Sequence, residues 1–244
     1  MRDAIILAGF GSADDTVRAK TFDALATELA ENFPAFEIRQ AFTSNFMRRK
    51  LERRGVIINS PADEIARLRR DGYRKIFLLP THLTRGEEFD GKIASCAAED
   101  VTIIPPLLSE PVPQKIFAAI VECFPRADDE DLILVGHGSP HRHNAVYESL
   151  QRMAGEDVHI GVIEQNDTPS FADVVGRHLR EKILLAPLLF NGGVHVAQDI
   201  DGDSDSWRVR LTAAGHKVRV VRDGLGTFKN FRRLLIESVA EKIR

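Results

Sequence analysis

The chain has 244 residues, a formal net charge of −3, 43% hydrophobic residues and 28% charged residues. These values are ordinary for a globular protein of one or two domains and exclude a disordered chain. Without a dense Lys/Arg stripe, there is no reason to expect nucleic acid as a partner. No apolar run approaches the ~20 residues that span a bilayer, and the first strand begins at Asp3 without room for a signal peptide. We therefore expect a cytoplasmic protein with no membrane partner.

Short apolar runs alternate with helical patterns along the first half of the chain. The run AIILAGF (4–10) predicts a buried strand, and Ser12 is expected to cap the helix after it. The acidic run RADDED (126–131) contains no large apolar residue, so it predicts a linker. Further strands are predicted at 37–42, 75–80 and 101–108, and helices at 14–31, 61–70 and 113–123.

The same series of elements then restarts. LILVGHGS (132–139) corresponds to AIILAGFGS, and the later strands are predicted at 158–164, 182–190 and 218–225. An ungapped alignment that sets Lys75 on Lys182 also pairs Gly86 with Gly193. The sequence therefore contains an internal duplication.

Strands separated by helices form βαβ units, which give parallel sheets. The sequence thus predicts an α/β fold of two similar doubly wound parallel-sheet domains that face each other across a cleft. We expect the first domain at 1–127 and the second at 128–229. A closing helix at 230–244 has no counterpart in the first half, and we expect it to pack back on the first domain.

Three polar residues follow strands at the edge where open parallel sheets bind ligands. His137 comes directly after the first strand of the second half, between two glycines. Glu88 and His195 occupy corresponding positions in the loops after the third strand of each half. Two imidazoles and one carboxylate suit a divalent first-row metal ion with coordination positions left open.

Other motifs are less specific. Gly9-Phe10-Gly11-Ser12 resembles a phosphate-binding turn but lacks the third glycine of a dinucleotide fingerprint and the lysine of a P-loop. The basic run RRKLERR (48–54) fits either a solvated helix face or a surface that binds an anionic ligand. The run DGDSDSW (201–207) has no EF-hand spacing and is expected to be a solvated loop, with an acidic lip to the metal site as the alternative.

Four motifs follow one another along the chain: Phe42-Thr43-Ser44 with Arg49, His82 with Gly86-Glu87-Glu88-Phe89, Gly136-His137-Gly138, and Gly193-Val194-His195 with Asp199. With these motifs in order, the chain resembles the anaerobic sirohydrochlorin cobaltochelatases, a family of class II, ATP-independent tetrapyrrole chelatases. The resemblance implies a chelatase-like fold and an enzyme that inserts Co²⁺ into sirohydrochlorin in anaerobic cobalamin synthesis, releasing two pyrrole protons. It implies no cofactor beyond the substrate metal, no ATP, and His137, His195 and Glu88 as metal-binding and catalytic residues.

Sirohydrochlorin carries many carboxylates, which suit backbone N–H groups at helix starts and basic side chains. Two alternatives remain open at this point: a ferrochelatase that inserts Fe²⁺ for sirohaem or haem, and a non-catalytic tetrapyrrole or metal carrier. A homo-oligomer is the default expectation for such an enzyme. The expected substrate-binding residues are Phe10, Gly11, Ser12, Thr43, Ser44, Arg49, His82, Gly138, Ser139, Gly192 and Gly193.

Overall fold

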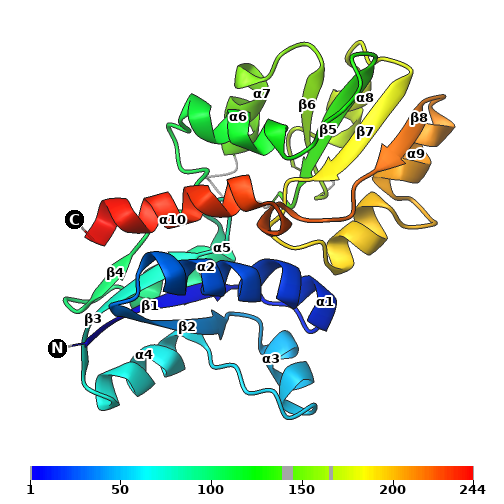
Figure 1. The fold of residues 1–244 in the computed structure, drawn as a ribbon. Helices are drawn as coiled ribbons and strands as arrows, with labels where there is room; N and C mark the ends of the chain where they lie inside the picture. The colour runs from blue at the N-terminus through cyan, green and yellow to red at the C-terminus, as the bar shows by residue number, and fades with distance from the viewer. Residues whose placement is uncertain (1, 139–144, 165–166, 244) are drawn as a thin grey trace. The chain divides into compact units, whose positions relative to one another are not determined.

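The computed structural model describes residues 2–138, 145–164 and 167–243. Contacts divide the chain into a first unit, Met1–Leu107 with Arg232–Arg244, and a second unit, Leu108–Phe231. Each unit contains one four-stranded sheet whose strand pairs are all parallel (Figure 1). The predicted α/β fold with two similar parallel sheets is therefore confirmed. In the described ranges, no helix is long and apolar enough to cross a membrane.

The first unit is a sheet of order β2-β1-β3-β4. The strands are β1 (Arg2–Gly9), β2 (Phe36–Phe42), β3 (Tyr73–Pro80) and β4 (Val101–Ile103). The helices are α1 (Asp15–Arg18), a π-helical turn (Ala19–Asp23), α2 (Ala24–Asn32), α3 (Asn45–Glu52), α4 (Pro61–Arg70), α5 (Glu87–Lys92), a 3₁₀ turn (Ala94–Cys96) and most of α10 (Lys229–Ile243).

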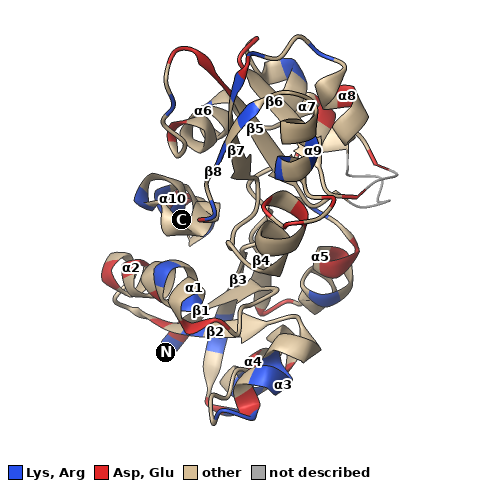
Figure 2. Cartoon of the chain, turned by 90° about the vertical axis from the view of Figure 1, so that its right-hand side faces the viewer, with Lys and Arg blue, Asp and Glu red and all other residues tan. Residues whose placement is uncertain are grey.

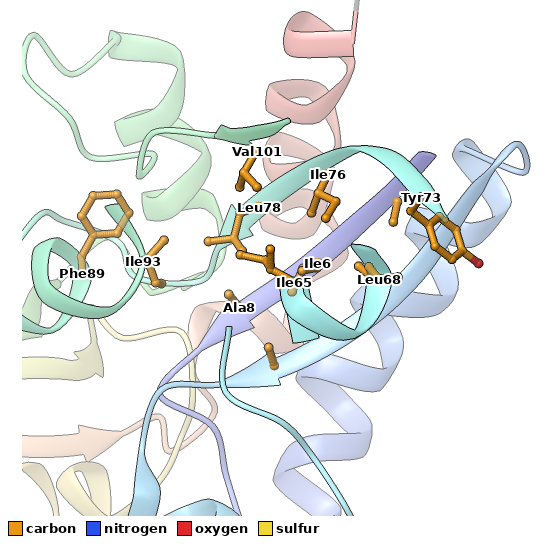
Figure 3. Packing of buried hydrophobic residues seen from close by; sticks show 12 residues of the cluster. Ile6, Ala8, Ile65, Leu68, Tyr73, Ile76, Leu78, Phe89, Ile93 and Val101 are labelled. Atoms are coloured by element: carbon orange, nitrogen blue, oxygen red, sulfur yellow. The ribbon is translucent and has the colours of Figure 1, made fainter. Parts of the chain in front are cut away.

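The core of the first unit lies on both faces of its sheet. On one face, Ile6 of β1 packs in a cluster with Ile65 and Leu68 of α4 (Figure 3). Successive strand residues point to opposite faces, so Ile5 and Leu7 point away from this cluster. Both are fully buried as well. A sheet covered on both faces is the doubly wound arrangement, and it leaves the carboxyl ends of the strands for a binding site.

The second unit repeats this arrangement with a sheet of order β6-β5-β7-β8. Its strands are β5 (Glu130–Gly136), β6 (Val158–Val162), β7 (Lys182–Pro187) and β8 (Lys217–Val220). Its helices are α6 (Gln114–Glu122), α7 (Val146–Met153), α8 (Phe171–Val175), a π-helical turn (Val196–Ile200), α9 (Trp207–Ala213) and a 3₁₀ turn (Leu225–Thr227).

A close approach between β6 and α9 organises one face of the second sheet. A Cβ added at Gly161 would lie 2.3 Å from Cη2 of Trp207, so only glycine lets the indole lie against the strand. Trp207 is buried and its ring stacks edge-on against Phe171 at 5.0 Å. The prediction that Trp207 ends a solvated loop was wrong, because Ser206 caps α9 and Trp207 is the first residue of that helix.

The division between the units lies at Leu107 rather than at residue 127. Residues beyond Leu107 are held in the second unit by contacts distant in sequence. The ring of Phe124 packs edge-on against Phe228 at 5.3 Å, and the Cys123 thiol donates to Asn230 Oδ1 at 3.3 Å. Local composition carries no signal for such contacts.

The acidic run at 126–131 is not the predicted linker throughout, because its last two residues begin β5. Asp131 is buried and accepts a hydrogen bond from the Arg180 backbone N–H at 2.8 Å. Its carboxylate also lies 3.3 Å from His159 Nε2. A buried carboxylate is tolerated where it is paired in this way.

The closing helix α10 belongs mostly to the first unit. Its Arg232 forms a two-point ion pair with Glu28 of α2, at 2.6 and 3.0 Å. Its apolar residues Leu235 and Val239 are buried.

Candidate active site

The two predicted histidines of the second unit lie side by side. His137 follows the last residue of β5, and His195 stands at the start of the π-helical turn after β7. Because β5 and β7 are neighbouring parallel strands, both residues lie at the carboxyl edge of the sheet. Their ring centroids are 4.7 Å apart and the rings are nearly perpendicular, at 83°.

The glycines beside His137 are required by packing and by backbone conformation. A Cβ added at Gly136 would lie 2.4 Å from the Tyr147 ring. Gly138 has a φ of +75°, in the left-handed region that favours glycine, and an added Cβ would lie 2.9 Å from Val162. The GHG motif therefore serves a tight turn that sets His137 at the end of its strand.

Each histidine uses one ring nitrogen in a local hydrogen bond. His137 Nδ1 lies 2.7 Å from the Gly138 carbonyl oxygen, and His195 Nδ1 lies 2.8 Å from Asp199 Oδ2. Carbonyl and carboxylate oxygens only accept, so Nδ1 carries the proton and the lone pair of each neutral ring is on Nε2. A carboxylate that holds Nδ1–H also makes the other nitrogen a better metal ligand. Sequence reasoning gave Asp199 no role, although its four-residue spacing from His195 on a helical turn was a usable signal.

Glu88 lies on α5 of the first unit and is held by two neighbours. The Thr43 hydroxyl donates to its carboxylate at 2.6 Å, and Lys92 Nζ lies 2.9 Å away. Burial by itself raises the pKa of Glu88, but the hydrogen bonds from Thr43 and Lys92 outweigh it and leave that pKa below its ordinary value. Glu88 is therefore a carboxylate at neutral pH.

His82 follows β3 beside Glu88. Both of its ring nitrogens are buried, and neither has a hydrogen-bond partner among the described residues. The ring contacts Phe89 edge-on with centroids 6.3 Å apart. Burial lowers the pKa of His82 to about 4, although the Glu88 carboxylate opposes the shift. This ring is neutral at any pH where the enzyme would work.

The buried neutral ring of His82 makes stability depend on pH. The unfolded chain titrates this group near 6.5, whereas the folded chain does so at about 4. Between these values the unfolded chain binds more protons, so the free energy of unfolding falls as the pH drops through this window. Between about pH 7 and about pH 4.5, we expect the wild type to lose roughly 2 kcal/mol more than His82→Leu, measured by urea unfolding. Equal losses of unfolding free energy in both proteins would contradict the low pKa of His82 in the folded chain.

The loops after β1 and β2 are joined by backbone hydrogen bonds. The Thr43 N–H donates to the Gly9 carbonyl at 2.8 Å, and the Ser44 N–H donates to the Phe10 carbonyl at 3.4 Å. Gly11, with a φ of +95°, packs so closely on Phe42 that an added Cβ would lie 2.3 Å from its ring. The structure thus brings together the predicted substrate-binding residues of these two loops.

The predicted anion site at the helix start after Gly11-Ser12 is not available in the form expected. Asp14, not Ser12, caps α1, and its carboxylate already accepts the N–H groups of Thr16 and Val17. The Ser12 hydroxyl instead accepts the Asp14 N–H at 3.1 Å. The Ser44 hydroxyl caps α3 by accepting the Met47 N–H at 3.3 Å.

The other predicted substrate-binding residues lie in different local environments. Gly192 packs on the Arg222 backbone, where an added Cβ would lie 2.1 Å from the carbonyl oxygen. Gly193 differs, because no atom lies within 4 Å of an added Cβ. Arg49 is exposed on α3, and Ser139 lies outside the described residues.

His137 and His195 belong to the second unit, whereas Glu88 belongs to the first unit. Within residues 2–138, 145–164 and 167–243, no group of three or more His, Cys, Asp or Glu side chains is placed to hold a metal ion.

Two curated proteins are similar to this chain along most of its length. Sirohydrochlorin cobaltochelatase of Salmonella typhimurium is 26% identical over 242 residues, which cover 93% of this chain and 90% of that protein. Sirohydrochlorin cobaltochelatase CbiKC of Nitratidesulfovibrio vulgaris is 28% identical over 248 residues, covering 94% and 86%.

Solved structures show the same fold at lower identity. SirB from Bacillus subtilis with Fe³⁺ matches with a TM-score of 0.64 and 13% identity, covering 99% of this chain and 95% of that one. CbiX, the terminal enzyme of siroheme biosynthesis in denitrifying bacteria, matches with a TM-score of 0.55 and 22% identity, covering 98% and 99%. The sequence model of the family described as cobalt chelatase (CbiK) matches residues 3–244. The chain therefore belongs to the cobalt chelatase (CbiK) family.

Proposed function

We propose that this protein inserts Co²⁺ into sirohydrochlorin. The family match over residues 3–244 and the two relatives named as sirohydrochlorin cobaltochelatases support this activity. The structural observation that carries it is the pair of histidines 4.7 Å apart, each with Nδ1 engaged and the lone pair on Nε2. Imidazole nitrogen is a common ligand of divalent first-row metals, the group to which Co²⁺ belongs.

The proposed reaction replaces protein ligands with macrocycle ligands. His137 and His195 hold the incoming Co²⁺ through Nε2, and Glu88 acts on the same ion as the third group. As the four pyrrole-type nitrogens bind the metal, two pyrrole N–H bonds break and their proton pair passes through a nearby base to water. The four new metal–nitrogen bonds more than offset the bonds to the protein that are lost, so we propose that insertion needs no ATP.

The charge on Glu88 fits this role. A divalent cation that sheds water needs negative charge nearby, and Glu88 stays ionised because Thr43 and Lys92 lower its pKa. Lys92 Nζ lies 2.9 Å from this carboxylate, so an incoming metal ion competes with the ammonium group for it. Co²⁺ binding at Glu88 therefore displaces a salt bridge.

The test is an absorbance assay with purified protein, metal-free sirohydrochlorin and Co²⁺, Fe²⁺ or Ni²⁺ in turn, without added ATP. We expect many macrocycles to be metallated per protein molecule, fastest with Co²⁺. Metallation that stops at one macrocycle per protein molecule would identify a carrier, and a faster reaction with Fe²⁺ would identify a ferrochelatase. Rates no higher than those of the metals in buffer would reject the proposal.

A further inference from the structure

Helix α3 carries positive charges that are not neutralised. Arg49 and Lys50 lie on its last turn and Arg53 follows it, and all three are exposed. Figure 2 shows the Lys and Arg segments of α3 in blue. In the described part of the chain, none of them forms an ion pair with a carboxylate. Arg54, by contrast, pairs with Asp15. Unpaired cations gathered on one short helix attract anions.

Large apolar side chains are exposed beside these charges. Phe46 on the first turn of α3 is 64% exposed, and Phe10 in the loop after β1 is 47% exposed. The two loops are tied together by the hydrogen bond from the Ser44 N–H to the Phe10 carbonyl. Exposed rings next to unpaired cations match a ligand that is both planar and anionic.

This surface is continuous with the environment of Glu88. Ser44 caps α3, and the residue before it, Thr43, donates its hydroxyl to the Glu88 carboxylate at 2.6 Å. The Lys92 ammonium group also donates to the Thr43 carbonyl, at 3.2 Å. The N-cap residue of α3 is therefore the direct neighbour of Thr43, which binds Glu88, the carboxylate proposed to act on the metal.

We propose that α3 with Phe10 forms the binding surface for one edge of the macrocycle, with Phe46 and Phe10 against the ring and Arg49, Lys50 and Arg53 on its carboxylates. This inference rests on the proposed function and extends it to substrate recognition. It favours an anion-binding surface over a solvated helix face for the basic run at 48–54. A ligand with several ionised carboxylates around an apolar ring fits both the charge and the apolar character of this surface.

The test compares two double variants that remove the same amount of charge. Arg49→Gln with Lys50→Gln neutralises α3. The control is Arg70→Gln with Arg74→Gln, which neutralises two exposed arginines at the opposite, amino-terminal edge of the same sheet. All four positions are exposed and glutamine keeps a long polar side chain, so neither variant should unfold the protein.

Binding is measured by fluorescence titration of metal-free sirohydrochlorin at about 0.05 to about 0.5 M NaCl, because salt screens exposed charges. We expect the α3 variant to bind roughly tenfold more weakly at low salt and to lose most of the salt dependence. The control should match the wild type. Equal affinities for all three proteins, or equal losses in both variants, would overturn the proposal.

Two further probes test which anion this surface binds. The wild type should prefer uroporphyrin, an octacarboxylate, over coproporphyrin, a tetracarboxylate, and the α3 variant should lose this preference. Sedimentation with phosphatidylserine vesicles tests a membrane surface as the partner. Vesicle binding lost in the variant while macrocycle affinity stays unchanged would reject the proposal. Because these titrations contain no metal, their outcome is independent of whether insertion occurs.

Discussion

Alanine at either His137 or His195 is expected to reduce cobalt insertion by at least about 100-fold, because each ring is proposed to supply one of the nitrogen ligands that hold the incoming metal. Loss of a group that merely orients a ligand costs ~10–100-fold, so loss of the ligand itself should cost more. The His195 side chain is 49% exposed and its Nδ1 is bonded to Asp199 on the same turn, so thermal unfolding should change little. Initial rates of Co²⁺ insertion and melting temperatures of each variant check this.

A graded comparison tests whether the histidines act through the metal. Asp199→Asn should lower the rate by ~10–100-fold and weaken Co²⁺ binding, because the amide can leave the His195 ring in the wrong tautomer or orientation. Asp203→Asn is the control, since Asp203 is exposed on the loop that follows and pairs with Arg208 instead. Full activity in either alanine variant would refute the proposed ligand pair.

Glu88→Gln is expected to slow cobalt insertion by about 10–100-fold, comparable to losing a supporting group around a metal site. Glutamine keeps the size of the side chain, and its amide oxygen can still accept the hydrogen bond from the Thr43 hydroxyl. The change therefore removes the charge with little change of shape. The affinity for metal-free sirohydrochlorin should stay within about twofold, because the charge acts on the metal and not on the ring. Insertion rates at saturating macrocycle and varied Co²⁺ distinguish an effect on the metal from an effect on binding of the macrocycle.

The neighbouring residue provides the control for this substitution. Glu87 is exposed and precedes Glu88 on α5, so Glu87→Gln removes the same charge from the same helix. We expect Glu87→Gln to keep the wild-type rate. Equal losses in the two variants would mean that the general charge of α5 matters and that Glu88 has no specific part in insertion.

Local sequence signals were sufficient for most elements of the fold. Pro61 at the first helical position and the Ser60 cap mark the start of α4, and the structure has α4 at the predicted residues. The repeat of strand and loop also placed His137 and His195 after neighbouring strands, where their rings meet.

Features that depend on distant contacts could not be predicted. The division at Leu107 results from packing such as that of Phe124 on Phe228, which no local composition reveals. A local signal was missed as well, because Lys92 and Asp199, the partners of Glu88 and His195, each lie only four residues along the chain. Their roles required knowing that both segments turn as helices at those places.

The return of α10 to the first unit makes the second unit an insertion in the topology of the first. Residues 108–231 form one uninterrupted stretch that could in principle be excised as a gene fragment, whereas the first unit has no such contiguous form. A fragment ending at Leu107 would leave Glu28 without Arg232 and remove the apolar face that Leu235 and Val239 provide. In this chain the second unit is therefore encoded by one continuous segment, whereas the first depends on two separate segments.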